Sequence, residues 1–245
     1  MMTLGDSFGG WEVLIFIAFA VLAAVGGYFG HLAAKKRREA LAAKAAELGL
    51  SFFHGRDTGY DEEYAHFELF ARGFGRAAYN TMSGRVEVGG HEMLCKMGDF
   101  TYKTREGSGK NRRTVTHRFS YMILHLPWGA AMPDLLIRKE GFFDKIGAAF
   151  GFDDIDFESA EFSRTYCVKS ANKKFAYDVC HQRMIEFLME TGPSSVDIER
   201  GRLCMTDGSR VWKPEAFGYT LGWANDFVGR WPDFVVKDLN EGRIS

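Results

Sequence analysis

The longest apolar run in the chain covers residues 13–34, which are 22 residues without Asp, Glu, Lys or Arg. As an α-helix, this run would span roughly 33 Å, enough to cross a bilayer core of about 30 Å. Trp11 before the run, and Tyr28 or Phe29 near its end, suit the aromatic belts at membrane interfaces. The pattern therefore predicts a single transmembrane helix over residues 13–34.

The charges that flank the run separate an anchor from a cleaved signal peptide. A signal peptide carries positive charge before its apolar segment, whereas this chain has only Asp6 and Glu12 there. Four basic residues follow the run directly: Lys35, Lys36, Arg37 and Arg38. Because such residues favour the cytoplasmic side, we interpret the run as an uncleaved anchor in the inner (cytoplasmic) membrane. Residues 1–12 are then a short extracytoplasmic tail, and the chain after residue 35 is cytoplasmic.

Two features of this segment each allow two interpretations. The four basic residues either serve only as a topology signal or also bind anionic lipid, at about 1 kcal/mol per residue. Gly26 and Gly30 form a G-x-x-x-G spacing. This spacing is either a helix-packing face for a protein partner or homo-oligomer, or a chance pattern in an apolar span. Residues 35–49 are rich in helix formers up to Gly49, and they predict a juxtamembrane helix that continues the span.

Mixed periodicity over residues 50–245 predicts an α+β domain, with a mainly antiparallel sheet and segregated helices. Residues 91–104, with an irregularity near Gly98, are expected to form a hairpin with residues 114–126. Residues 196–205 are expected to form a second hairpin that turns at Gly201. The other expected strands are residues 67–70, 76–82, 134–139 and 162–168, and the expected helices are residues 142–150, 173–191 and 214–228.

Composition narrows the class of protein. The 245 residues include 31 Lys+Arg, 32 Asp+Glu and 46% hydrophobic residues. This balance favours a folded domain and argues against a generally basic nucleic-acid binder. The cysteines, which lack C-x-x-C spacing, are Cys95, Cys167, Cys180 and Cys204. We expect free, mostly buried thiols in a reducing compartment, whereas the reverse orientation would allow two disulfides.

Several short motifs resemble parts of binding or catalytic sites, but each lacks the neighbouring residues that such a site requires. Residues 73–78 (GFGRAA) lack the following helix of a dinucleotide site, and residues 107–110 (GSGK) lack the flanking residues of a P-loop, so both are interpreted as turns. His91 and Cys95 lack further metal ligands, and the acidic residues at 153–158 lack calcium-loop spacing. We therefore predict no catalytic residue, no metal and no cofactor. A membrane-tethered enzyme with an unrecognised site stays an alternative, with Cys180 or His181 as its best candidates.

The segment from residue 103 to residue 118 holds six basic residues against the single acid Glu106. On an exposed hairpin, this charge would meet anionic headgroups or an acidic partner, or it would only deter edge pairing in solvent. Nucleic acid is not expected, because the tip has no interleaved aromatic residues for base stacking. The candidate lipid-binding residues of the whole chain are Lys35, Lys36, Arg37, Arg38, Lys110, Arg112 and Arg113.

The order of features resembles a family of uncharacterised bacterial single-pass membrane-anchored proteins with a cytoplasmic domain. The likeness covers most of the chain. Besides the span and its basic block, the residues that carry it are AAELGLSFF (45–53), FELF (67–70), GFGRAAYNTMSG (73–84), GDFTYKT (98–104) and GFDDIDFESAEFSRTYCV (151–168). These motifs are aromatic, glycine and turn residues, so the resemblance implies membrane anchoring without an assigned activity or site.

These observations favour a membrane-anchored cytoplasmic interaction module that binds a protein partner or anionic lipid headgroups. The alternatives are a structural subunit of a larger membrane complex and the tethered enzyme.

Overall fold

The computed structural model describes residues 10–141 and 153–244, and the chain divides into two compact units between Ala40 and Leu41. The first unit is the greater part of α1 (Gly10–Glu47), a continuous helix of 38 residues. Its apolar side chains, such as Leu14, Phe16 and Phe19, are 66–73% exposed. A soluble core helix would bury these side chains, so α1 is a candidate membrane span by its length, composition and exposure.

The second unit is built on a sheet of eight strands in which every pairing is antiparallel. The spatial order is β1-β2-β3-β4-β8-β7-β5-β6. The strands are β1 Ser51–Phe53, β2 Phe74–Val88, β3 His91–Glu106, β4 Arg113–His125, β5 Leu135–Lys139, β6 Tyr166–Lys169, β7 Ser195–Glu199 and β8 Arg202–Thr206. Together with the helices, this sheet gives the predicted α+β fold.

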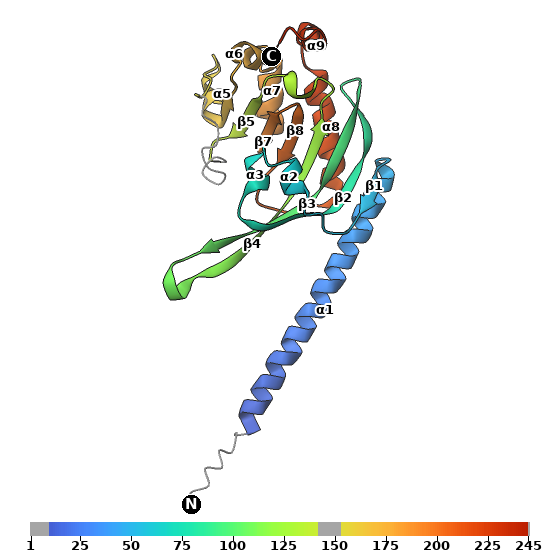
Figure 1. Cartoon of the computed structure of the whole chain (residues 1–245), viewed down its shortest axis with the longest axis vertical. Coiled ribbons are helices and arrows are strands. Elements are labelled where there is room, and N and C mark those ends of the chain that lie inside the picture. The colour runs from blue at the N-terminus through green and yellow to red at the C-terminus, as the bar shows by residue number, and fades with distance from the viewer. Residues whose placement is uncertain (1–9, 142–152, 245) are drawn as a thin grey trace, which may run out of the picture. The chain divides into compact units, whose positions relative to one another are not determined.

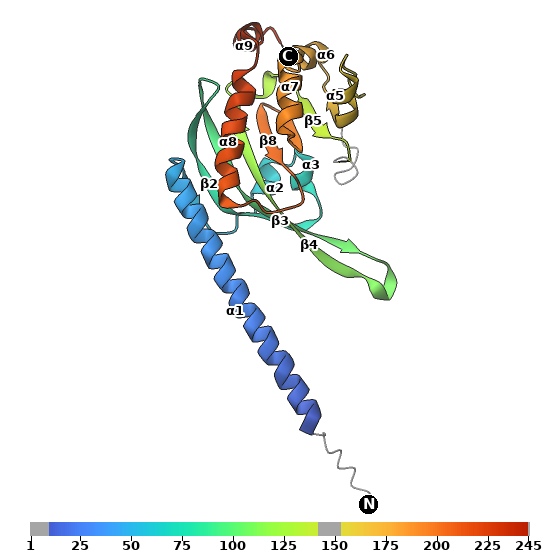
Figure 2. The same cartoon turned by 180° about the vertical axis from the view of Figure 1, so that it is seen from behind.

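Helices cover both faces of the sheet (Figures 1 and 2). Those on one face are α5 Ala160–Thr165, α6 Lys173–Val179, α7 Gln182–Thr191, α8 Pro214–Gly229 and α9 Asp233–Asn240. The other face carries the short helices α2 Tyr60–Glu63 and α3 Glu68–Ala71. Two 3-10 turns complete the described elements, η1 Gly109–Asn111 and η2 Gly129–Ala131.

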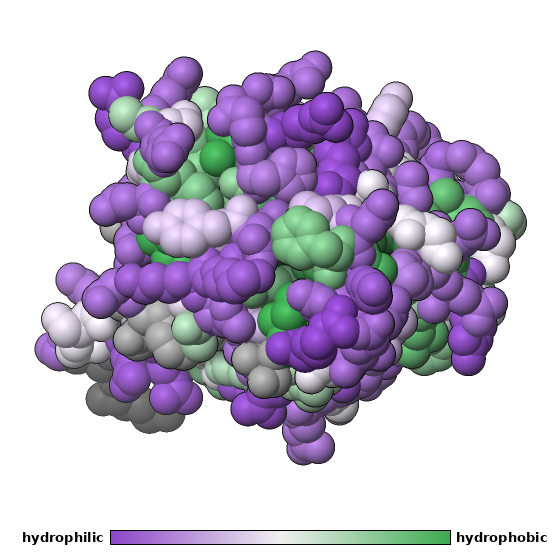
Figure 3. Space-filling view, turned by 90° about the horizontal axis from the view of Figure 1, so that it is seen from above, coloured by the Kyte–Doolittle hydropathy of each residue, from purple (hydrophilic) through white to green (hydrophobic). Residues whose placement is uncertain are grey.

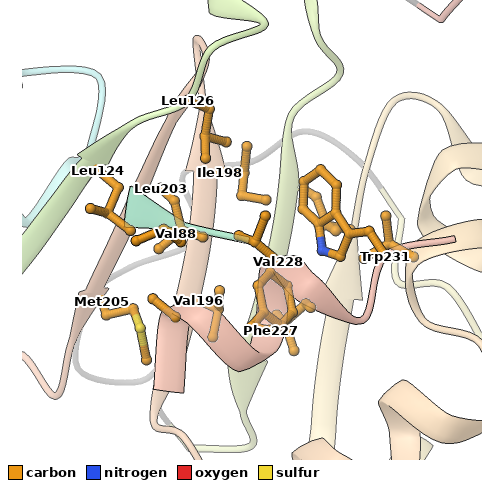
Figure 4. Packing of buried hydrophobic residues seen from close by; sticks show 14 of the residues in the cluster. Val88, Leu124, Leu126, Val196, Ile198, Leu203, Met205, Phe227, Val228 and Trp231 are labelled. Carbon is orange, nitrogen blue, oxygen red and sulfur yellow. The ribbon is translucent and has the colours of Figure 1, made fainter. Parts of the chain in front are cut away.

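The larger core lies between the sheet and α5–α9. Phe227 and Val228 of α8, followed by Trp231, face the strand residues Val196 and Ile198 (Figure 4). Each such side chain gains about 1.5–3 kcal/mol on full burial, so this layer supplies much of the stability. The surface seen from the α6 and α9 end is mostly hydrophilic, with hydrophobic residues in separate islands (Figure 3).

A smaller aromatic core lies beneath α2 and α3. The Phe70 ring lies 4.8 Å from Phe100 and 5.3 Å from Tyr121, both in edge contacts. Alternation along β4 places Tyr121 and Ile123 in this core and Met122 and Leu124 in the larger one. The sheet is therefore buried on both faces.

The long hairpin and the Gly201 hairpin are confirmed. β3 and β4 pair from Leu94↔His125 to Glu106↔Arg113. The irregularity predicted near Gly98 is a register shift of the partner strand between Tyr79 and Met82. A Cβ at Gly98 would lie 2.8 Å from the Asn80 carbonyl oxygen, so the close approach of the two backbones requires glycine.

Three expected elements are wrong in part. Residues 67–70 form most of a helical turn in place of a strand, since short apolar runs fit either periodicity. Residues 162–168 begin in α5, whose N-terminus is capped by the Ser159 hydroxyl, before β6 starts. The helix predicted over 173–191 is divided into α6 and α7. The helix predicted over 142–150 lies outside the described residues, while β1, α2 and α9 were not anticipated.

Candidate functional site: the basic hairpin

The hairpin end of β3 and β4 projects from the rest of the sheet as a two-stranded ribbon (Figure 1). Residues directly opposite in an antiparallel pair share a face. The pairs Thr101↔Arg118, Lys103↔Thr116 and Arg105↔Thr114 therefore place three basic side chains on one face. All three are exposed, and the Arg105 guanidinium lies 5.1 Å from the centre of the Phe74 ring. Because β2 still pairs with β3 at Thr101 and Lys103, this positive face begins on the three-stranded part of the sheet and continues onto the ribbon at Arg105.

The opposite face of the ribbon is held by side-chain contacts. The His117 ring stacks on Tyr102 with centroids 4.7 Å apart, and its Nε2 lies 2.7 Å from the Thr104 hydroxyl oxygen. Nearer the tip, the Arg113 guanidinium donates to the Glu106 carboxylate at 3.1 Å. The single acid of the hairpin is thus already engaged by one of its six cations.

The tip turns at Gly107, whose φ of +79° favours glycine, and continues through η1. Lys110, Arg112 and Arg113 are exposed there. With His117 neutral, residues 103–118 carry a net charge of +5. Such a protrusion creates a positive potential that attracts anions and weakens with ionic strength. It is suited to binding an anionic surface by charge.

The other predicted site residues lie on α1 in the first unit. Lys35 and Lys36 are exposed, Arg37 and Arg38 are partly exposed, and the Lys35 ammonium lies 3.8 Å from the Glu39 carboxylate. At Gly26 and Gly30, no described atom lies within 4 Å of the position that a Cβ would take. The lipid-binding role of the basic block and the helix-packing role of the glycines stay predictions.

Cys180 and His181, the candidates for a hidden active site, lie in different surroundings. Cys180 is buried, and burial raises the pKa of its thiol to about 12, so the sulfur is protonated at neutral pH. The His181 Nε2 lies 3.0 Å from the Arg230 carbonyl oxygen. His181 also lines a surface hollow of about 850 Å³ with Asp233, and Cys180 is not part of that lining.

All four cysteines are free and buried. Burial raises the pKa of Cys95, Cys167 and Cys180 to about 12, and that of Cys204 well above its ordinary value. We expect a water-soluble maleimide to modify none of them in the folded chain at neutral pH, and all four after denaturation. Intact-mass measurement of both samples checks this result, and rapid labelling of the folded chain would contradict the packing.

Of the two glycine motifs, residues 107–110 form a turn, as interpreted from the sequence, whereas residues 74–78 already belong to β2 and only Gly73 lies in the bend between α3 and β2. Gly73 and Gly75 have φ of +62° and +61° at the entry to β2, and residues 107–110 form the hairpin tip. Within the acidic segment, the Asp154 carboxylate accepts from the backbone amides of Ile155 and Val168, which attaches this segment to β6. The described ranges contain no group of three or more His, Cys, Asp or Glu side chains placed to hold a metal ion.

A buried charge cluster on the α2–α3 side of the sheet was not predicted from the sequence. The Arg138 guanidinium of β5 donates to both carboxylate oxygens of Asp197 on β7, at 2.9 and 2.8 Å. The two side chains are only 3% and 8% exposed. Glu199, two residues further along β7, is also buried, and its Oε1 has no hydrogen-bond partner among the described residues. A charged residue at every second strand position usually marks a solvent face, which explains why this cluster was missed.

Glu199 makes stability depend on pH. Burial, reinforced by the nearby Asp197 carboxylate, raises the pKa of Glu199 from 4.5 to about 9. The folded chain therefore keeps a proton that the unfolded chain loses above about pH 4.5, so stability falls as pH rises from there towards 9.

We expect Glu199→Gln, which keeps the shape without the ionisation, to unfold at nearly the wild-type temperature at pH 5. At pH 9 it should be more stable than wild type by several kcal/mol, because each unit by which the Glu199 pKa is raised corresponds to about 1.4 kcal/mol. Thermal unfolding of both proteins across this range checks the prediction. A constant difference between them at all pH values would contradict it.

Comparisons with known proteins bear on the fold. Neither protein-family models nor curated proteins gave a match. Among solved structures, the chain is similar to the mycobacterial trehalose monomycolate transport factor A, TtfA, with a TM-score of 0.53 and 13% sequence identity. The likeness covers 81% of this chain and 96% of TtfA. At this identity it shows a shared fold. The resemblance inferred from the sequence is supported only in part. The chain has a candidate membrane span, and its fold is similar to that of a mycobacterial transport factor.

Proposed function

We propose that this protein is a single-pass, membrane-anchored module whose domain lies in the cytoplasm, where its basic hairpin binds anionic lipid headgroups. The observation that carries the proposal is the hairpin itself. Its cations are exposed along one face and around the tip, while its only acid is paired with Arg113. Each basic residue near an anionic surface contributes about 1 kcal/mol, so several together give a stable contact.

The orientation rests on the charges that flank the span. Lys35–Arg38 follow the apolar run, and no basic residue precedes it. We compare two reporters fused after Ser245, one that works only in the cytoplasm and one that works only in the periplasm. We expect the cytoplasmic reporter to be active and the periplasmic reporter to be inactive. Replacing all four basic residues by Gln should produce a mixed orientation, whereas replacing Lys173 and Lys237 should not. Periplasmic activity of the wild-type fusion would contradict the proposed orientation.

Hydrogen exchange tests the headgroup contact on the full chain. We expect the amides of residues 103–118 to exchange more slowly in nanodiscs containing phosphatidylglycerol than in nanodiscs of phosphatidylcholine alone. The difference should shrink at high salt, because the contact is electrostatic. Identical exchange in both lipids would contradict the proposal.

A second candidate function is an accessory subunit of a membrane transport complex. It is favoured by the shared fold with TtfA, which is described as a transport factor. In this case Gly26 and Gly30 would form the contact with other helices. Gly26→Leu should then release the chain from a complex isolated from gently solubilised membranes, with Gly27→Leu as the matched control. Unchanged recovery of the same partners would contradict this role.

A further inference from the structure

A pocket of about 560 Å³ lies between α8, the end of α7 and the loop that follows β8. Its size falls within the range of small-molecule sites. Much of its lining is apolar: Met205 of β8, Val211 and Trp212 of the loop, and Ala216 and Trp223 of α8. The hairpin does not line it, so a ligand here would be a property separate from the proposed headgroup contact.

The loop that forms one wall is preformed. The Asp207 carboxylate accepts from the backbone amides of Ser209 and Arg210, both at 3.1 Å, and from the Arg210 side chain at 2.6 Å. The Trp212 amide donates to the Ser120 hydroxyl at 2.9 Å, which ties the loop to β4 near the base of the hairpin. The pocket therefore needs no loop closure before a ligand enters.

The opposite wall is equally constrained. The Trp223 ring stacks with Phe187 and Phe227, at 5.1 Å in each case, and its Nε1 donates to the Thr191 hydroxyl at 2.8 Å. Trp223 therefore presents a fixed apolar edge, and its ring faces are already covered. Such a wall suits an alkyl chain better than a stacked base or sugar ring.

Charged side chains, more of them basic than acidic, lie beside the pocket. A polar hollow of about 450 Å³ shares Ser194, Asp207 and Arg210 with the apolar pocket, and Lys139 and Glu140 also line it. Lys213 lines the apolar pocket at the start of α8. Within the described ranges, Lys139 and Lys213 form no ion pair, whereas the Asp207 charge is engaged by Arg210. An apolar pocket with the ammonium groups of Lys139 and Lys213 beside it is complementary to an anion that carries an alkyl chain.

We propose that this pocket binds the chain of a single-chain lipid anion, with its carboxylate or phosphate held by Lys139 and Lys213. A free fatty acid and a lysophospholipid share this chemistry. A neutral amphiphile of equal length does not.

The test uses the full chain in phosphatidylcholine nanodiscs and three photoreactive diazirine probes: a fatty acid, a lysophosphatidylglycerol and an alkyl alcohol of the same length. We expect at least one anionic probe to label residues 205–223, with about tenfold less labelling by the alcohol. Labelling by the fatty acid alone assigns a carboxylate ligand, and labelling by both anions assigns a general single-chain anion. Equal labelling by the alcohol, or labelling confined to residues 13–34, would overturn the proposal.

Two sets of variants keep the result specific. Lys139→Gln combined with Lys213→Gln should reduce anionic labelling of the pocket about tenfold, while Lys173→Gln combined with Lys237→Gln should leave it unchanged. Ala216→Trp, which fills the pocket, should abolish it. Thiol protection of the buried cysteines reports whether each variant is folded. If Ala216→Trp does not fold, the lysine pairs decide, and equal labelling of both pairs would overturn the assignment.

Discussion

Arg138→Ala is expected to destabilise the domain by about 3–5 kcal/mol, because it leaves the Asp197 carboxylate buried without its guanidinium partner. For a domain of this size, the loss corresponds to a fall of roughly 10 °C in melting temperature. Burial already raises the pKa of Asp197 against the opposing charge of Arg138. Without that charge the carboxyl would take up a proton or draw in water, and either change costs stability. Thermal unfolding of the full chain in nanodiscs measures the effect.

Two further variants test whether the loss of stability in Arg138→Ala comes from the buried charge that is left behind or only from the loss of an ion pair. Arg138→Met combined with Asp197→Leu removes both charges and should recover most of the stability. Arg113→Ala breaks an ion pair whose side chains are 76% and 43% exposed, so it should cost no more than about 1 kcal/mol. Equal losses in the Arg138 and Arg113 single variants would contradict the proposed cause.

The second large effect concerns the hairpin tip. Replacing Lys110, Arg112 and Arg113 together by Gln should weaken the contact with anionic headgroups by about 3 kcal/mol, or about a hundredfold. The loss should disappear at high salt, where the contact is screened in both proteins. The fold should be unaffected, because all three side chains are exposed.

A matched control carries the same charge change elsewhere. Lys173, Arg183 and Lys237 are exposed on or beside α6, α7 and α9, and their replacement by Gln also removes three positive charges. This control should keep the contact within about twofold of wild type. If both triple variants lost binding equally, net charge would be the cause and the hairpin would have no special role.

Much of the architecture could be predicted because it follows from local patterns. The span is a long run without charges, and the hairpin over 91–126 is marked by two strand-like runs around a Gly-rich tip. Gly201 follows Arg200 in a two-residue turn where both have positive φ, which two-residue hairpins favour. These signals depend on neighbours in sequence and not on tertiary contacts.

The rest depends on partners that are distant in sequence. Phe67 and Phe70 fit a strand or a helical turn, and the contacts of Phe70 with Phe100 and Tyr121 accompany the helical form. Arg138 and Asp197 lie 59 positions apart, so no local pattern shows that they meet or that helices cover that face of the sheet. The pocket likewise combines α7, α8 and the loop after β8, which no single motif reveals.

The measurement that tests the proposed function most directly is the position of the hairpin tip relative to the bilayer. The exposed Ser108→Cys provides the labelling site, since the native thiols are buried and protonated. A spin label attached there is examined by electron paramagnetic resonance on the full chain in nanodiscs with and without phosphatidylglycerol. We predict contact with the headgroups only in the anionic nanodiscs, and its loss at high salt and in the Lys110, Arg112 and Arg113 triple variant. A label that stays in water in both lipids would contradict the proposal that the hairpin binds the membrane.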